Sequence, residues 1–224
     1  KLLGMPFFYN ILLRSILIAF LATGLCFVIA YPFSYFLSQS KHRDLLLLFV
    51  LIPFWTSALI RIYALIGLLK AHGLINAFLI SMRLINSPIE MIYNQASVVI
   101  GLSYTLLPFM ILPLYNFFTK FDKALIAAAY DLNASNTYIF KTIIWPLSLP
   151  SVKSSMLMIF FPAMTTFYIP TILGGAHSML LGNLIENQFL LLNDWPSGAT
   201  TSILIILLMF VCLKNINTNK RGYE

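Results

Sequence analysis

Negative charge is the scarcest feature of this sequence. Only 9% of its 224 residues are charged, and Asp and Glu together number 7, whereas about 25% of the residues in an ordinary soluble domain are charged. Paired carboxylates, a Ser/His/Asp set, a phosphate-binding loop and metal-ligand spacings do not occur as sequence patterns. We therefore predict that the chain is not an enzyme, and we assign no catalytic, cofactor-binding or metal-binding residue.

Cysteine is also scarce. Cys26 and Cys212 both lie inside apolar runs, without the spacing of metal ligands, so neither a disulfide nor a metal site is expected. The net charge of +7 would suit nucleic-acid binding only if the basic residues formed a patch. They stand instead at the ends of apolar runs, and nucleic-acid binding is not expected.

Apolar residues, by contrast, make up 60% of the chain. Their runs are long and unbroken, unlike the alternating segments of about ten residues in outer-membrane barrels. A helix of about 20 apolar residues crosses a bilayer. Five windows are near that length, at residues 11–37, 45–69, 96–118, 154–173 and 198–213. The predicted fold is all-α, a polytopic transmembrane helical bundle that forms one domain over residues 1–224.

Lysine and arginine predict the orientation of these spans, because they are enriched in cytoplasmic loops. One set of loops carries nine of them, namely Lys41, Arg43, Lys120, Lys123, Lys141, Lys153, Lys214, Lys220 and Arg221. The opposite set carries Lys1, Arg14, Lys70 and Arg83. The first set and the C-terminus are therefore predicted to be cytoplasmic. Five spans put the two ends on opposite sides, and we expect an additional N-terminal span, missing from this sequence, to make six.

The segment 71–95 is apolar but interrupted by polar residues and a proline, His72, Arg83, Pro88 and Glu90. We expect it to form a short helix in the outer interface of the membrane. The alternative is a re-entrant segment or another span. That alternative would place the lysine-rich 120–153 loop outside, against the charge distribution.

The apolar runs are interrupted at residues 124–150 by ALIAAAYDLNASNTYIFKTIIWPLSLP. Residues 123–132 are good helix formers. Asn133 suits the left-handed conformation that ends a helix, and Ser135 or Asn136 suits the N-cap of the next one. A helix, a turn and a second helix are predicted.

The second helix is expected to end near Trp145, because Pro146 and Pro150 follow it. We interpret residues 119–152 as a helix-turn-helix that projects into the cytoplasm between two spans. The alternative is an amphipathic loop that lies on the lipid surface.

The spacing of this segment resembles the EAA loop of ABC-importer permeases, which reads Glu-Ala-Ala, three residues, Gly, nine residues, Ile, one residue, Leu-Pro. The matching positions here are Ala127, Ala128, Ala129, Asn133, Ile143, Trp145 and Pro146. The resemblance implies that residues 119–152 dock into a cleft of a cytoplasmic ATPase and carry nucleotide-driven motion to the spans. It also implies the type I importer permease fold.

The chain departs from this pattern at three positions. Ala127 stands in place of the family's Glu, Asn133 in place of Gly and Trp145 in place of Leu. Asn tolerates the left-handed turn and Trp keeps an apolar contact. The lost Glu removes a charge, and whether the nearby Asp122 or Asp131 replaces it stays open.

The resemblance extends over nearly the whole chain. The stretches LLFVLIPFWTSALIRIYALIGLL, ASVVIGLSYTLLPFMILPLYNFFTKFDKALIAAAYDLNAS and LGGAHSMLLGNLIENQFLLLNDWPSGATTS are similar to the permease family of spermidine/putrescine ABC importers, specifically its PotB-type subunit. The resemblance implies a bacterial inner-membrane importer for polyamines. Its other parts would be a PotC-type second permease, a dimer of PotA-type ATPase and a PotD-type periplasmic binding protein. ATP and Mg would bind the ATPase subunits and not this chain.

The five predicted spans contain no Asp or Glu, so aromatic faces are the candidates for contact with a polyamine cation. The candidate residues are Trp55, Tyr63, Tyr104, Phe161 and Tyr168, together with Phe109 and Phe167. The alternative is that they pack the core or form interfacial belts. Arg61 is the one charged residue that lies well inside a predicted span. We expect it to snorkel or to brace the outer gate rather than to bind a cation.

The predicted outer loop 174–197 contains His177, Glu186 and Asp194 but no lysine or arginine. It suits an outer mouth that attracts cations and faces the binding protein. Asp194 and Trp195 fit equally well an ordinary turn and a belt residue.

Three other functions stay open on the sequence alone. The first is an importer permease for another small substrate, which would use the same cytoplasmic loop. The second is an ATP-independent channel or carrier, for which ionisable residues at mid-membrane or internal repeats are expected. The third is an uncoupled relic, suggested by Ala127.

Overall fold

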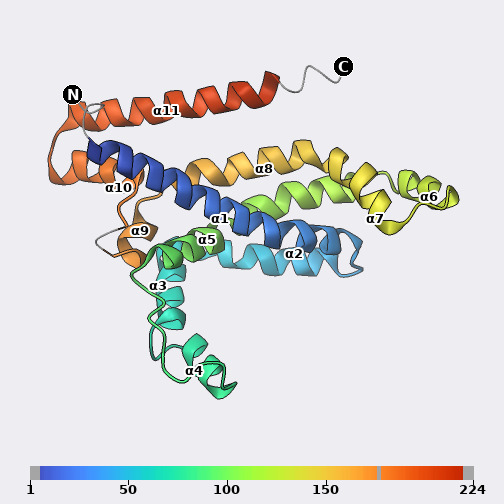
Figure 1. Ribbon diagram of the computed structural model, residues 1–224, viewed down its shortest axis with the longest axis horizontal. Helices are drawn as coiled ribbons and strands as arrows, with labels where there is room; N and C mark the ends of the chain where they lie inside the picture. Colours follow the sequence, from blue (N-terminus) through green and yellow to red (C-terminus); the bar gives the residue numbers. More distant parts are fainter. Residues whose placement is uncertain (1–5, 176–177, 219–224) are drawn as a thin grey trace.

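The computed structural model describes residues 6–175 and 178–218, and in this part of the chain every regular element is a helix. Figure 1 shows the longest helices lying side by side along one direction. The all-α prediction is confirmed. Four residues named above, Lys1, His177, Lys220 and Arg221, lie outside the described residues.

Three helices form the centre of the molecule: α1 (Pro6–Gln39), α5 (Gln95–Lys120) and α8 (Trp145–Thr165). A stripe of small, fully buried residues lets α1 lie close to α5, and its members are Ala19, Ala22, Cys26 and Ala30. The Ser103 hydroxyl of α5 donates to the Ala22 carbonyl at 3.3 Å. The Ser34 hydroxyl donates in turn to the Ile111 carbonyl at 3.2 Å.

The second predicted span is divided. Residues 45–69, expected as one helix, form α2 (Arg43–Leu51), a 3₁₀ turn (Ile52–Trp55) and α3 (Ala58–Leu69). Pro53 starts the turn, and Thr56 is extended with φ −90° and ψ 152°. Figure 1 shows α2 along the long helices and α3 turned away from them. The prediction of a continuous helix was wrong because the chain leaves the helical conformation three residues after this proline.

A short helix, α4 (Leu74–Ser81), follows α3, as expected for the 71–95 segment. Its Asn76 side chain is fully buried. The amide donates to the carbonyls of Lys70 at 3.1 Å and Ile89 at 2.9 Å, and its oxygen accepts from the Ile89 N–H at 2.9 Å. These bonds hold Lys70 and Ile89, which precede and follow α4, close together.

Four segments of the described chain are long and apolar enough to cross a membrane: Phe7–Gln39, Ala58–Ser81, Gln95–Lys120 and Asn136–Thr165. A shorter apolar helix covers Trp195–Phe210. The fourth segment ends earlier than the predicted 154–173, because Thr166 is extended with ψ 129°.

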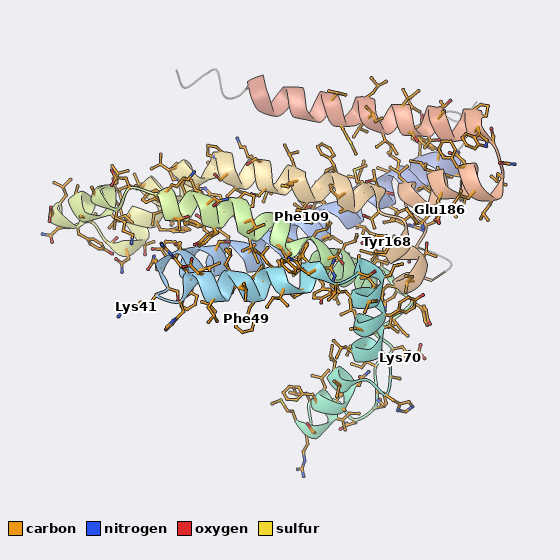
Figure 2. The ribbon with its side chains drawn as sticks, turned by 180° about the vertical axis from the view of Figure 1, so that it is seen from behind. Lys41, Phe49, Lys70, Phe109, Tyr168 and Glu186 are labelled. Carbon is orange, nitrogen blue, oxygen red and sulfur yellow. The ribbon has the colours of Figure 1, made fainter. Side chains whose placement is uncertain are left out.

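Helices α6 (Lys123–Asp131) and α7 (Asn136–Ile139) lie at one end of the long helices, and α9 (Tyr168–Leu173) and α10 (Leu181–Glu186) at the other. A π-helical turn (Asn187–Leu191) joins α10 to α11 (Trp195–Thr218). Figure 2 shows Lys41 at the α6 end and Glu186 at the opposite end. The α10 end is tied to the centre by the Leu181 N–H, which donates to the Ser15 hydroxyl at 2.9 Å.

Candidate functional site

The predicted turn between α6 and α7 is present. Asp122 caps α6, because its carboxylate accepts from the Ala124 N–H at 2.9 Å. Asn133 has φ 59°, which confirms the left-handed conformation predicted for it. The adjacent Leu132 is 83% exposed. The corner therefore presents an apolar side chain at its tip.

Helix α7 starts at one of the two residues predicted to cap it. The Ser135 hydroxyl accepts from the Tyr138 N–H at 3.3 Å, so Ser135 is the cap. The Asn136 side chain has a different role, because its oxygen accepts from the Tyr130 hydroxyl at 2.6 Å. That bond joins α7 to α6 and fixes the angle of the corner.

The predicted end of the second helix near Trp145 was wrong. A π-helical turn (Phe140–Ile144) follows α7 and continues directly into α8, with Pro146 in the first turn and Pro150 inside the helix. A proline ring clashes with the carbonyl four residues earlier in a regular α-helix. The wider π turn, with hydrogen bonds between residues five apart, opens the backbone just before Pro146. Residues 136–165 consequently form one continuous helical rod.

The residues of the predicted coupling pattern divide into two groups. One group is exposed on α6 and the corner, namely Ala127, Ala128, Asp131 and Asn133, and Pro146 is exposed as well. The other group faces inward: Ala129 is buried, and Ile143 and Trp145 are half-buried. The pattern thus combines a surface that a partner can reach with an attachment to the centre of the molecule.

The inward attachment is a group of five aromatic rings around Tyr31, which we call the Tyr31 cluster. Its other members are Phe27, Phe118, Phe140 and Trp145, at ring-centre distances from Tyr31 of 5.4, 5.4, 6.2 and 5.7 Å. The Tyr31 and Ser148 hydroxyls lie 3.0 Å apart. The three pairs that Tyr31 forms with Phe118, Phe140 and Trp145 are edge-to-face, and such pairs stabilise beyond their buried area. The cluster joins α1, α5, the π turn and α8.

Sequence reasoning missed Tyr31. It stands within an apolar run, and three of its four ring partners, Phe118, Phe140 and Trp145, lie far away along the chain. The available signal was a tyrosine beside Pro32 towards the predicted cytoplasmic end of the first span. That signal does not identify the residues that Tyr31 contacts.

The five predicted pathway aromatics do not meet in one place within this chain. Tyr104 lines a hollow of about 280 Å³ with Arg61 and Phe54. Phe161 and Tyr168 line another, of about 420 Å³. Trp55 is 94% exposed and Tyr63 is 62% exposed.

Of the other two aromatics, Phe109 lies beside a lining residue of the first hollow, and Phe167 lines the second itself. Phe109 packs on Phe54 at 5.6 Å between ring centres, and Phe167 packs on Tyr168 at 6.1 Å.

The Arg61 guanidinium packs on an aromatic ring. Its guanidinium carbon lies 4.7 Å from the centre of the Phe54 ring, a cation–π contact. Its buried Nε has no hydrogen-bond partner in the described residues. The contact holds the start of α3 against the 3₁₀ turn.

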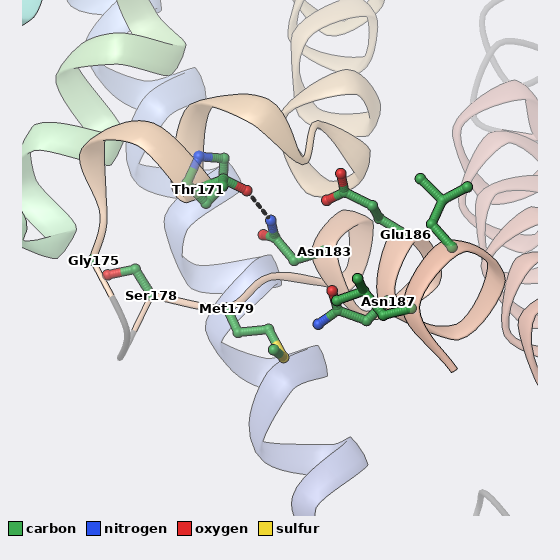
Figure 3. A pocket seen from close by; sticks show the side chains of 10 residues that line it. Thr171, Gly175, Ser178, Met179, Asn183, Glu186 and Asn187 are labelled. Atoms are coloured by element: carbon green, nitrogen blue, oxygen red, sulfur yellow. Dashed lines mark hydrogen bonds between the residues drawn. The ribbon is translucent and has the colours of Figure 1, made fainter. Parts of the chain in front are cut away.

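A larger hollow, of about 500 Å³, lies at the opposite end from α6. Its lining comes from α9, α10 and their neighbours: Pro170, Thr171, Gly175, Ser178, Met179, Asn183, Glu186, Asn187, Leu190 and Leu191. Figure 3 shows Thr171 and Asn183 joined by a hydrogen bond, with Glu186 and Asn187 beside them. We call it the outer hollow.

The two acidic residues of the predicted outer loop have different environments. Glu186 lines the outer hollow. Asp194 caps α11, where its carboxylate accepts from the Ser197 N–H at 3.2 Å. This hydrogen bonding to Ser197 holds the pKa of Asp194 below its usual value. Asp194 therefore fits the ordinary-turn interpretation and Glu186 the interpretation of a cation-attracting mouth.

Comparison with known proteins finds similar transport proteins over most of the chain. It is 44% identical over 210 residues to the spermidine/putrescine transport system permease protein PotB of Escherichia coli strain K12, covering 93% of this chain and 76% of that protein. It is 41% identical over 212 residues to PotB of Haemophilus influenzae, covering 92% of this chain and 74% of that protein. A comparison with protein-family models finds no match.

A solved structure has the same fold. It is a bacterial alginate ABC transporter in complex with an alginate pentasaccharide-bound periplasmic protein. One of its chains superposes with a TM-score of 0.80 at 12% sequence identity, covering 99% of this chain and 81% of that chain. At this identity the likeness concerns the fold alone.

Proposed function

The chain belongs to the PotB family of spermidine/putrescine ABC-importer permeases, and we propose that it forms half of the translocation pathway and is driven through residues 119–152. It is a multi-pass inner-membrane transport subunit, as the family and the apolar helices indicate. A permease of this kind is not an enzyme, and ATP is hydrolysed on a separate subunit.

The observation that carries the coupling role is the continuous rod of residues 136–165. A helix-turn-helix attached by a flexible loop would lose motion in that loop. Here α7 continues through the π turn into α8, and the Tyr31 cluster holds the same turn against α1 and α5. A displacement of the α6–α7 corner by a partner therefore moves three central helices together.

The proposed orientation places the α6–α7 corner and the C-terminus in the cytoplasm. The distribution of basic residues supports it, because Lys41 lies at the same end of the molecule as α6 and α7. Cytoplasmic loops are enriched in such residues. The outer hollow then faces the periplasm.

The proposed partners are a PotC-type second permease, a PotA-type ATPase dimer and a PotD-type periplasmic binding protein. The large apolar side chains left exposed on α11, Ile203, Ile206, Leu207 and Phe210, suit contact with the second permease or with lipid. ATP and Mg are assigned to the ATPase. Spermidine and putrescine are the proposed substrates.

Reconstitution tests this function. Proteoliposomes that contain this chain with its three partner types are expected to take up spermidine when ATP is supplied on the side of the membrane that carries the ATPase. Vesicles that lack only this chain are the control and are expected to show none. Equal uptake with and without the chain would reject the proposal.

A further inference from the structure

The outer hollow combines one acidic side chain with an apolar wall. Its volume of about 500 Å³ lies within the range of pockets that bind small molecules. Glu186 is its acidic member, Met179, Leu190 and Leu191 are apolar, and neither lysine nor arginine is among its described lining residues. A linear polyamine has the matching chemistry, with ammonium groups separated by methylene chains.

Among the described residues, the Glu186 carboxylate has no partner. Across residues 6–175 and 178–218 it has neither an ion pair nor a hydrogen bond, and the carboxamide of the next residue, Asn187, has no hydrogen bond either. Both side chains are half-buried. A carboxylate removed in part from water without a cation costs free energy unless a ligand supplies the charge.

Other carboxylates of the described chain are engaged differently. Asp122 and Asp194 cap helices, and Asp44 lies 3.7 Å from Arg43. Glu90 is exposed in the segment that joins α4 to α5. Glu186 therefore differs from them, because it lines a hollow and has no partner within residues 6–175 and 178–218.

The frame around Glu186 is fixed. The Asn183 amide nitrogen donates to the Phe167 carbonyl at 2.8 Å and to the Thr171 hydroxyl at 2.7 Å. Its oxygen accepts from the Leu180 N–H at 3.1 Å. A Cβ at Gly182 would collide with the Thr165 carbonyl, so α10 lies directly on the end of α8. The backbone of α10, which carries Glu186, is consequently fixed against α8 and α9.

We propose that the outer hollow binds an ammonium end of a linear aliphatic polyamine, with Glu186 as the charged acceptor and Asn187 as a neutral one. This proposal rests on the polyamine-importer function proposed above. A carboxylate with neutral oxygens replaces the water around an ammonium group. The apolar side chains accommodate the methylene chain, so the site favours a diamine or triamine over an inorganic cation.

Equilibrium binding of radiolabelled spermidine tests the site. The complete transporter, with both permeases and the ATPase pair, is placed in nanodiscs without the periplasmic binding protein. Glu186→Gln is expected to weaken binding about tenfold or more, because a charge-assisted hydrogen bond is lost. Glu90→Gln removes an exposed carboxylate outside the hollow and is the matched control, expected to bind as the unaltered transporter does.

A second variant keeps the test decisive if Glu186→Gln fails to assemble. Asn187→Asp adds a carboxylate beside Glu186 and is expected to tighten spermidine binding. No change in either variant would overturn the site, and so would an unaltered transporter that binds no spermidine.

Measuring association with the periplasmic binding protein distinguishes spermidine binding by Glu186 from a different role, contact with that protein. If Glu186→Gln binds spermidine normally but no longer binds that protein, Glu186 pairs with a basic residue of the partner and the site is overturned. Uptake by the unaltered transporter with all partners is measured alongside. Normal uptake together with normal binding by Glu186→Gln refutes the site and leaves the importer function standing.

Discussion

Single side chains decide how the α6–α7 end of this permease is attached to the central helices. Tyr31 is 8% exposed, and its hydroxyl lies 3.0 Å from the Ser148 hydroxyl. Ser148 in turn donates to the Trp145 carbonyl at 2.8 Å. The family's Leu position is thus filled by a tryptophan that extends the ring packing to α1.

The Tyr31 cluster predicts a change in coupling. Tyr31→Leu removes its ring contacts and its hydroxyl, at a cost of at least about 1 kcal/mol in stability. We expect more ATP to be hydrolysed for each polyamine taken up by the reconstituted importer, because the π turn loses its attachment to α1. Tyr35→Leu is the matched control, since Tyr35 packs on Phe118 at 5.3 Å from the next turn of α1. An unchanged ratio in Tyr31→Leu would contradict the transmitting role.

Local chemistry predicted some residues and not others. The left-handed Asn133 and the Ser135 cap follow from side-chain chemistry within a few residues, and both were predicted. Tyr31 and Ser148 are 117 positions apart, and nothing local to either names the other. For Glu186 and Asp194, the sequence offered a turn only for Asp194, and it did not decide between that turn and a cation-attracting mouth. They differ once Asp194 is seen to cap α11.

At the scale of elements, prolines show why helix ends were the hardest feature to predict. Pro53 and Pro146 both follow apolar runs, yet the helix ends after Pro53 and continues through Pro146. The π turn makes the difference, and it is stabilised by packing on Tyr31 that sequence cannot reveal. A helical rod therefore replaced the predicted break, while α1 and α5 matched their predicted spans because their apolar runs are long.

The α6–α7 corner predicts the effect of charge on ATPase association. Asn133→Lys places a cation on the exposed turn that is proposed to enter the ATPase cleft, and we expect less ATPase to co-purify with the permease. Lysine in the left-handed conformation also costs about 1 to 2 kcal/mol. Asn133→Ala carries a similar backbone cost without the charge, and it is expected to retain more ATPase. Normal co-purification of Asn133→Lys would count against docking at this corner.

At the scale of the whole molecule, the two ends of the long helices present different features. Lys41 lies at the α6–α7 end, which presents the exposed Leu132 at its tip, whereas the other end holds Glu186 in the outer hollow. The arrangement suits an importer that receives a cation at one face and is driven from the other. The presence of several long apolar helices follows from composition, although four segments of the described chain, and not the predicted five, are long and apolar enough to cross a membrane. The positions of α2, α3 and α11 depend on tertiary contacts and were not predictable.

The most direct test of the account is the side of the membrane on which the α6–α7 corner lies. Leu132→Cys, in a chain with Cys26→Ala and Cys212→Ala, provides a labelling site at the tip, where the native side chain is 83% exposed. Glu90→Cys, in the same background, provides a control site in the segment that joins α4 to α5.

A membrane-impermeant maleimide is applied to inverted vesicles and to spheroplasts. It is expected to label the Leu132→Cys variant in inverted vesicles but not in spheroplasts, and the Glu90→Cys variant in the reverse order. Bound ATPase is expected to protect the thiol at the tip. Labelling of the Leu132→Cys variant in spheroplasts would contradict the account.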